Sequence, residues 1–306
     1  MLAYAFPGQG SQYTGMGRIL VRRYPEAEET LVRAEKISGR PLRHLLYDLS
    51  DEELKRTENT HPAVFLYEAA LYDVLKRDTS PDVVFGHSLG ELAALYAAGV
   101  LDFETALSLV LERGRIIVED SGREGGMVAL IGENVLSLAE EVLKRLTSVG
   151  VVISNYNSPK QIVLSGHRVE LDKVVDFIEK QARRMRARIR AVRLKISFAS
   201  HSPLVEGASN RLARILEGVR FRDPVVPIVM NTTGKVALTA SDVKRAVVRQ
   251  LSSPVRFVDM VREAVGIGVR EAWEVGPGRV LSGLISQITD RIRAVPMDPK
   301  YSPIRT

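Results

Sequence analysis

The stretch VVFGHSLGELAAL, residues 83–95, restricts the fold of this chain more than any other. A short apolar run ends in GHSLG, which places Ser88 between Gly86 and Gly90, and a segment of helical periodicity follows. Gly-x-Ser-x-Gly at a strand-to-helix junction is typical of the nucleophile elbow, whose sharp turn leaves room only for glycine beside the serine. The alternative is a glycine-flanked turn in which the serine has no chemical role.

Two further segments repeat the order of strand, tight turn and helix. LAYAF at 2–6 stops at PGQG, and VREAWEVGPG at 269–278 leads into the apolar stretch RVLSGLISQI. Three such units predict an α/β fold, in which helices cover a mostly parallel sheet.

The segment 125–197 has a different rhythm. Its apolar patterns predict a strand, a helix, two strands joined by the turn SPK, a second helix and a last strand at 186–196. This β-α-β-β-α-β order is that of the ferredoxin-like unit. We therefore predict a ferredoxin-like small subdomain at 125–197, inserted into a larger catalytic subdomain formed by 1–124 and 198–306.

Composition narrows the chemistry. The 306 residues include no cysteine, which excludes disulfides, thiolate nucleophiles and cysteine metal sites. The five histidines form no H-x-x-x-H pair, so we expect no metal site. Because neither a signal peptide nor a run of about 20 apolar residues is visible, we expect a cytoplasmic protein that engages no membrane. The net charge of +6 suits an anionic ligand or an acidic partner.

A serine hydroxyl needs a neighbouring base to act as a nucleophile. Two histidines follow Ser88 in the chain. His167, in SGHRVE, lies at the edge of the predicted hairpin, where we expect it to be solvated. His201, in FASHSPL, lies at a predicted strand-to-helix junction where the chain returns to the larger subdomain, which makes it the better candidate base.

The loop FPGQGSQ at 6–12 is the third signal. It fails the dinucleotide-binding pattern G-x-G-x-x-G, because Tyr13 stands where the third glycine is needed. We expect the loop to bring the backbone N–H of Gln9 to an oxyanion hole, opposite the N–H of Leu89 in the elbow. The alternative is a simple tight turn.

These motifs together resemble the malonyl-CoA:acyl-carrier-protein acyltransferases, a family that includes the acyltransferases of polyketide synthases. The resemblance covers nearly the whole chain and implies an α/β-hydrolase-like core with a ferredoxin-like insertion. It rests on FPGQGSQ, GHSLGE, LERG at 111–114, ISNYNSP at 153–159, FASHSPL at 198–204, NTTGK at 231–235, QLSSPVRF at 250–257 and EVGPG at 274–278.

The resemblance also implies an activity. A malonyl or related carboxyacyl group passes from CoA to Ser88, and then to the phosphopantetheine thiol of an acyl carrier protein, with His201 as base. Gln9 and Leu89 donate to the oxyanion, and Arg113 pairs with the acyl carboxylate. The expected partners are a CoA thioester and an acyl carrier protein, without a cofactor or nucleic acid, and we expect a monomer.

Two supporting positions and three departures follow from the same resemblance. Gln250 matches the position near which a backbone carbonyl, rather than a carboxylate, orients the family's histidine, and Asn231 matches a position near the site. The family often has glutamine where THPA places His61, and R-G-x-x-M-Q where this chain reads RGRIIV at 113–118. Ser200 stands before the base, where malonyl-selective members often have phenylalanine, so the acyl preference stays open.

Two rival functions fit the same elbow: a serine thioesterase or acyl hydrolase, and a non-catalytic module that binds a carrier protein. A separate question concerns the alternation of Arg184, Arg186, Arg188 and Arg190 with smaller or apolar residues. On a strand, this period of two places the four arginines on one face. Such a face is either solvated or docks an acidic carrier protein or the phosphates of CoA.

Overall fold

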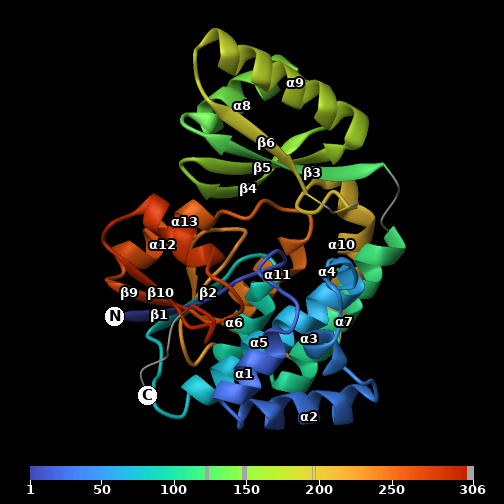
Figure 1. Ribbon diagram of the computed structural model, residues 1–306, viewed down its shortest axis with the longest axis vertical. Helices are drawn as coiled ribbons and strands as arrows, with labels where there is room; N and C mark the ends of the chain where they lie inside the picture. Colours follow the sequence, from blue (N-terminus) through green and yellow to red (C-terminus); the bar gives the residue numbers. More distant parts are fainter. Residues whose placement is uncertain (121–123, 147–149, 195, 197, 302–306) are drawn as a thin grey trace.

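The computed structural model describes residues 1–120, 124–146, 150–194, 196 and 198–301. Figure 1 shows two units stacked along the long axis: a small unit with α8 and α9, and a larger unit that contains all the other labelled helices. Each unit is built on its own sheet. One predicted subdomain boundary, at residue 197, lies outside the described residues.

The larger sheet has six strands in the order β10-β9-β1-β2-β7-β8. Every neighbouring pair is parallel except β7 and β8, as the repeated strand–turn–helix units predicted. The strands are β1 (Leu2–Phe6), β2 (Val83–Gly86), β7 (Ile228–Val229), β8 (Val236–Ala237), β9 (Glu271–Glu274) and β10 (Arg293–Pro296).

Helices cover both faces of this sheet because its central strands are apolar on both sides. Tyr4 and Phe6 of β1 pack into the larger core, whereas Ala3 and Ala5 pack into a second core with α12 and α13. The helices of the larger unit are α1 (Met16–Arg23), α2 (Ala27–Ser38), α3 (His44–Tyr47), α4 (Asp51–Leu54), α5 (Thr57–Leu75), α6 (Gly90–Ala97), α7 (Phe103–Asp120), α10 (Glu206–Glu217), α11 (Ala240–Gln250), α12 (Phe257–Gly266) and α13 (Val280–Ile288), with a 3₁₀ turn at Pro203–Val205.

The small unit is a four-stranded antiparallel sheet in the order β4-β5-β3-β6. Chain order and strand order together are those of the predicted ferredoxin-like unit. Its elements are β3 (Gly125–Gly132), α8 (Val135–Arg145), β4 (Val152–Ser158), β5 (Gln161–His167), α9 (Arg168–Arg184) and β6 (Ile189–Arg193). The α/β fold class with its inserted ferredoxin-like subdomain is confirmed.

The predicted arginine ladder is wrong. Arg184 is the last residue of α9, and Arg186 has a left-handed backbone with φ 56° where the chain leaves the helix. Arg188 precedes β6, so of the four arginines only Arg190 lies in the strand. A helix end and a turn interrupt the period of two, so the four side chains do not share one strand face.

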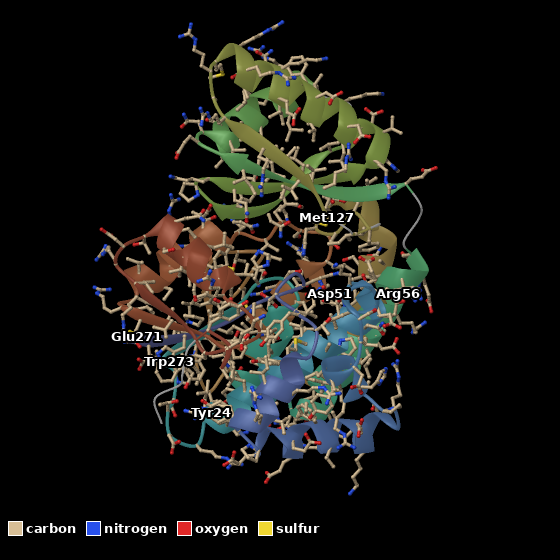
Figure 2. All side chains as sticks on the ribbon, in the orientation of Figure 1. Tyr24, Asp51, Arg56, Met127, Glu271 and Trp273 are labelled. Atoms are coloured by element: carbon tan, nitrogen blue, oxygen red, sulfur yellow. The ribbon has the colours of Figure 1, made fainter. Side chains whose placement is uncertain are left out.

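The two units are joined at β4. The backbone N–H of Tyr156 donates to the carbonyl oxygen of Val255 at 2.9 Å, and the backbone N–H of Val255 donates to the carbonyl oxygen of Ser154 at 2.9 Å. Figure 2 shows Met127 on the side of the small sheet that faces the larger unit. One face of the small sheet is therefore turned toward the larger unit. Among the described helices, none is both long and apolar enough to span a bilayer.

Candidate active site

Ser88 lies on a sharp turn between β2 and α6. Its φ is 51°, in the left-handed region that side chains rarely adopt. A Cβ on Gly86 would lie 2.1 Å from the carbonyl oxygen of Gly90, and one on Gly90 would lie 2.2 Å from that of Phe6. The backbones are therefore too close for any residue but glycine at both positions, which is the packing that a nucleophile elbow requires.

The loop after β1 packs against this elbow. A Cβ on Gly8 would lie 2.4 Å from the carbonyl oxygen of His87, so glycine is again required. Gln9 and Leu89 both line the cavity that contains Ser88. Neither backbone N–H has a hydrogen-bond acceptor among the described residues. Two free donors beside a serine hydroxyl are suited to a developing oxyanion.

His201 is held against the serine. The Ser88 hydroxyl lies 2.7 Å from Nε2 of His201, while Nδ1 lies 2.9 Å from the carbonyl oxygen of Gln250 and 3.0 Å from that of Ser253. Two carbonyl acceptors require a proton on Nδ1, so Nε2 accepts from the serine. No carboxylate is needed to orient the ring.

Burial, and secondarily the charge of Arg113, lowers the pKa of His201 to about 3. The imidazole is therefore neutral at neutral pH and free to take a proton. Like Ser88, His201 has a left-handed backbone, with φ 60°. Backbone strain of this kind concentrates at functional sites.

A buried polar network supports the elbow. The side-chain oxygen of Asn231 accepts from the N–H of Ser88 at 2.7 Å, and its amide nitrogen donates to Glu91 at 2.7 Å. The side-chain amide of Gln250 donates to the Ser88 carbonyl at 2.6 Å and to Glu91 at 2.9 Å. Burial raises the pKa of Glu91 to about 7, against the lowering effect of the bonds from Asn231 and Gln250.

Arg113, on α7, contacts the same serine. It is 3% exposed, and its Nη2 donates to the Ser88 hydroxyl at 3.3 Å. Its Nη1 lies 3.2 Å from Nε2 of His61 on α5. Both acceptors are neutral, and Nε has no partner among the described residues. Burial lowers the pKa of Arg113 to about 10, so the guanidinium remains a buried cation at neutral pH.

These groups surround one cavity of about 250 Å³ between the two sheets. The rest of the lining is mainly apolar and comes from both units: Ile117, Met127, Ala129, Val163, Leu194, Ile196, Leu281 and Leu284. Within the described part of the chain, no three acidic or histidine side chains gather as metal ligands.

The structure brings together all seven predicted site residues. Ser88, His201, Gln9, Leu89 and Arg113 line the cavity, while Asn231 and Gln250 bond to the elbow beneath it. His167 is exposed at the end of β5 and bonds to none of them.

Sequence reasoning missed three contributors. These are Glu91, which joins the two supporting amides, Ser253, whose carbonyl is the second acceptor for His201, and Asn157, which bonds to His87 at 2.8 Å. Glu91 directly follows the second elbow glycine, and a carboxylate on an apolar helix was the one available signal.

Comparison with known proteins agrees with this geometry. The family model of the acyl transferase domain matches residues 3–292, and the chain belongs to this family. The malonyl CoA-acyl carrier protein transacylase of Bacillus subtilis is 35% identical over 304 residues, which cover 98% of this chain and 94% of that protein. The Escherichia coli K12 transacylase is 36% identical over 295 residues, covering 95% and 94%.

Solved structures agree as well. The acyl carrier protein S-malonyltransferase of Vibrio cholerae superimposes with a TM-score of 0.90 at 33% identity, covering 97% of this chain and 96% of that one. A malonyl-transacylase in complex with a type II PKS acyl-carrier protein gives a TM-score of 0.89 at 35% identity, with coverage of 97% and 96%.

Proposed function

We propose that this chain transfers a malonyl group from CoA to the phosphopantetheine thiol of an acyl carrier protein. One observation carries the proposal: a serine on a nucleophile elbow is hydrogen-bonded to a neutral histidine and to a buried arginine that has no carboxylate partner among the residues the structure describes. The histidine and the serine on the elbow carry out acyl transfer, and the arginine selects an acyl group that has a free carboxylate. The family assignment and the nearly full-length transacylase relatives support the same activity.

The first half-reaction forms an ester on Ser88. The hydroxyl oxygen attacks the thioester carbonyl as its proton moves to Nε2 of His201. The amides of Gln9 and Leu89 then hold the oxyanion, a role in which one donor is commonly worth about 3 kcal/mol. When the carbon–sulfur bond breaks, the imidazolium returns its proton to the CoA thiolate.

The second half-reaction runs the same steps in reverse. The carrier protein's thiol gives its proton to His201 and attacks the serine ester. The carbon–oxygen bond breaks, and the serine oxygen recovers the proton from the imidazolium. No metal or redox cofactor enters either half. The acyl donor is a CoA thioester and the acceptor is a protein-bound phosphopantetheine thiol, and we place the reaction in the cytoplasm.

Arg113 is proposed to bind the malonyl carboxylate. It is a buried cation whose recorded acceptors are neutral, and Nη2 already points to the reacting oxygen. A guanidinium binds a carboxylate through two parallel hydrogen bonds, which fixes the acyl group as well as attracting it. A carboxylate forms stronger hydrogen bonds with the guanidinium than water does, so binding of the malonyl carboxylate completes the site.

Intact-protein mass spectrometry tests the proposal. Wild-type protein mixed with malonyl-CoA should gain one malonyl group, and should lose it to phosphopantetheinylated carrier protein when that is added. Ser88→Ala should gain none, because the attacking oxygen is gone. Loss of the adduct to water at the same rate without carrier protein would identify a hydrolase, and a wild-type protein that forms no adduct would contradict acyl transfer altogether.

A further inference from the structure

Within the described part of the chain, two side chains accept a hydrogen bond from Arg113: Ser88 and His61. His61 lies on α5, one residue before Pro62, and is 1% exposed. Arginine only donates, so Nε2 of His61 must carry a lone pair and Nδ1 must carry the proton. This tautomer is the neutral imidazole.

The neutral state is maintained by the surroundings. Burial, together with the charge of Arg113, lowers the pKa of His61 well below its usual range. The Nδ1–H group lies against Gly114 on α7, and has no acceptor among the described residues. A buried donor without an acceptor is unfavourable. Among the described residues, Arg113 supplies the only hydrogen bond to this ring.

Charge distinguishes this contact from an ion pair. A carboxylate at position 61 would also orient the guanidinium, but it would neutralise the charge that attracts a substrate anion. An apolar side chain would leave Nη1 of Arg113 buried without an acceptor. A neutral acceptor avoids both effects, because it fixes one edge of the guanidinium without adding a second negative charge to that of Glu91, which already favours the charged form of Arg113.

We propose that His61 is a positioning residue for carboxylated acyl groups: it anchors Nη1 of Arg113 without neutralising it, so that Nη2 stays aimed at the acyl group on Ser88. The inference rests on the proposed malonyl transfer. It also gives a physical meaning to the histidine in THPA, since a glutamine carbonyl offers the same neutral acceptor.

Three substitutions in the full chain distinguish the effect of a hydrogen-bond acceptor at position 61 from the effect of a charge there: His61→Gln, His61→Glu and His61→Leu. Each variant is mixed with equimolar malonyl-CoA and acetyl-CoA, and the ratio of malonyl to acetyl enzyme is measured by mass spectrometry. kcat and KM for malonyl-CoA are measured separately. His167→Leu, at the exposed histidine, is the matched control and should keep the wild-type ratio.

We expect His61→Gln to keep the ratio within about threefold. His61→Leu should lower it roughly tenfold, chiefly through a higher KM for malonyl-CoA, as befits one lost bond to a charged group. His61→Glu should lower the ratio further, because its carboxylate competes with malonate for Arg113. In an Arg113→Ala background, His61→Leu should have no further effect on the ratio, since the two residues act as one unit.

An unchanged ratio in His61→Leu, or a loss in His61→Gln as large as that in His61→Leu, would overturn the role of His61. A full effect of His61→Leu in the Arg113→Ala background would do the same. These failures differ from failure of the proposed function, in which the wild-type protein forms no malonyl enzyme. Thermal unfolding of each variant reports whether it is folded, and the Gln and Leu variants decide the question even if the Glu variant unfolds.

Discussion

On one wall of the cavity, the elbow side, Ser88 and His201 are held by Asn231, Glu91 and Gln250, and none of these side chains has a buried polar atom without a partner. A second wall, the helix side, is formed by residues of α5 and α7. There His61 and Arg113 each have a buried polar atom with no partner among the described residues.

The difference separates two tasks. Satisfied groups are fixed in place, as a nucleophile and base must be to act on any thioester. Unsatisfied groups can still form hydrogen bonds with a ligand. On the helix side, one of these groups, the guanidinium of Arg113, is also a buried positive charge. We infer that the elbow side performs the chemistry and that the helix side selects the acyl group. Substitutions on the two walls should therefore fail in different ways.

His201→Ala is expected to have the largest effect. Without a proton acceptor on Nε2, acylation should slow by about 10²–10⁴-fold, for malonyl-CoA and acetyl-CoA alike. Single-turnover acylation measures both rates. His167→Ala, at the exposed histidine, should leave them unchanged. A loss confined to malonyl-CoA would assign His201 to acyl selection and erase the distinction between the two walls.

Arg113→Ala should act on one substrate only. Malonyl transfer should fall roughly 10²-fold, because the carboxylate loses two charge-assisted hydrogen bonds, while acetyl transfer should change much less. The substitution also removes a charge that lowers the pKa of His201, so that pKa should rise. The acid limb of the acetyl transfer rate should then move to higher pH. Equal losses for both acyl groups would make Arg113 a structural residue.

Much of the elbow side could be predicted from the sequence because its signals are local. GHSLG predicts the turn, and glycine at 86 is required by a backbone contact with Gly90 only four residues later, although the contact that requires glycine at 90 is made with Phe6, far away in the chain. His201 could be chosen because few histidines follow Ser88. Arg113 is different: nothing in its neighbourhood distinguishes it from many other arginines, and only the family resemblance selected it.

Other features depend on contacts that the sequence does not encode locally. His61 and Arg113 lie on α5 and α7 and are 52 positions apart in the chain, so their contact depends on how these two helices pack. Glu91 is satisfied by Asn231 and Gln250, from two distant segments. The arginine ladder failed for a related reason. An alternating pattern does not indicate where a helix ends, and α9 continues to Arg184.

The last prediction concerns Glu68, whose substitution we expect to change stability rather than acyl transfer. It tests what burial without a hydrogen-bond partner does to a carboxyl group. Glu68 lies on α5, fully buried, behind the loop that carries Gln9: a Cβ on Gly276 would lie 3.2 Å from its Cγ and 2.4 Å from Pro7. Burial, and then the charge of Glu274, raises the pKa of Glu68 well above its usual range. Glu274 accepts from two backbone amides and a serine hydroxyl, so we assign the negative charge to it and the proton to Glu68.

The folded state therefore keeps the proton on Glu68 at a pH where the unfolded chain has lost it. Between the ordinary and the raised pKa the folded state binds more protons, so the free energy of unfolding falls as pH rises, by up to about 1.4 kcal/mol per pH unit. Glu68→Gln does not titrate, so its free energy of unfolding should rise relative to that of wild type between pH 5 and pH 8, by up to about 1.4 kcal/mol for each pH unit. Urea unfolding at both pH values measures this gain. Glu58→Gln, at an exposed position of the same helix, should show no such gain. An equal difference between Glu68→Gln and wild type at both pH values would mean that Glu68 ionises as an ordinary glutamate.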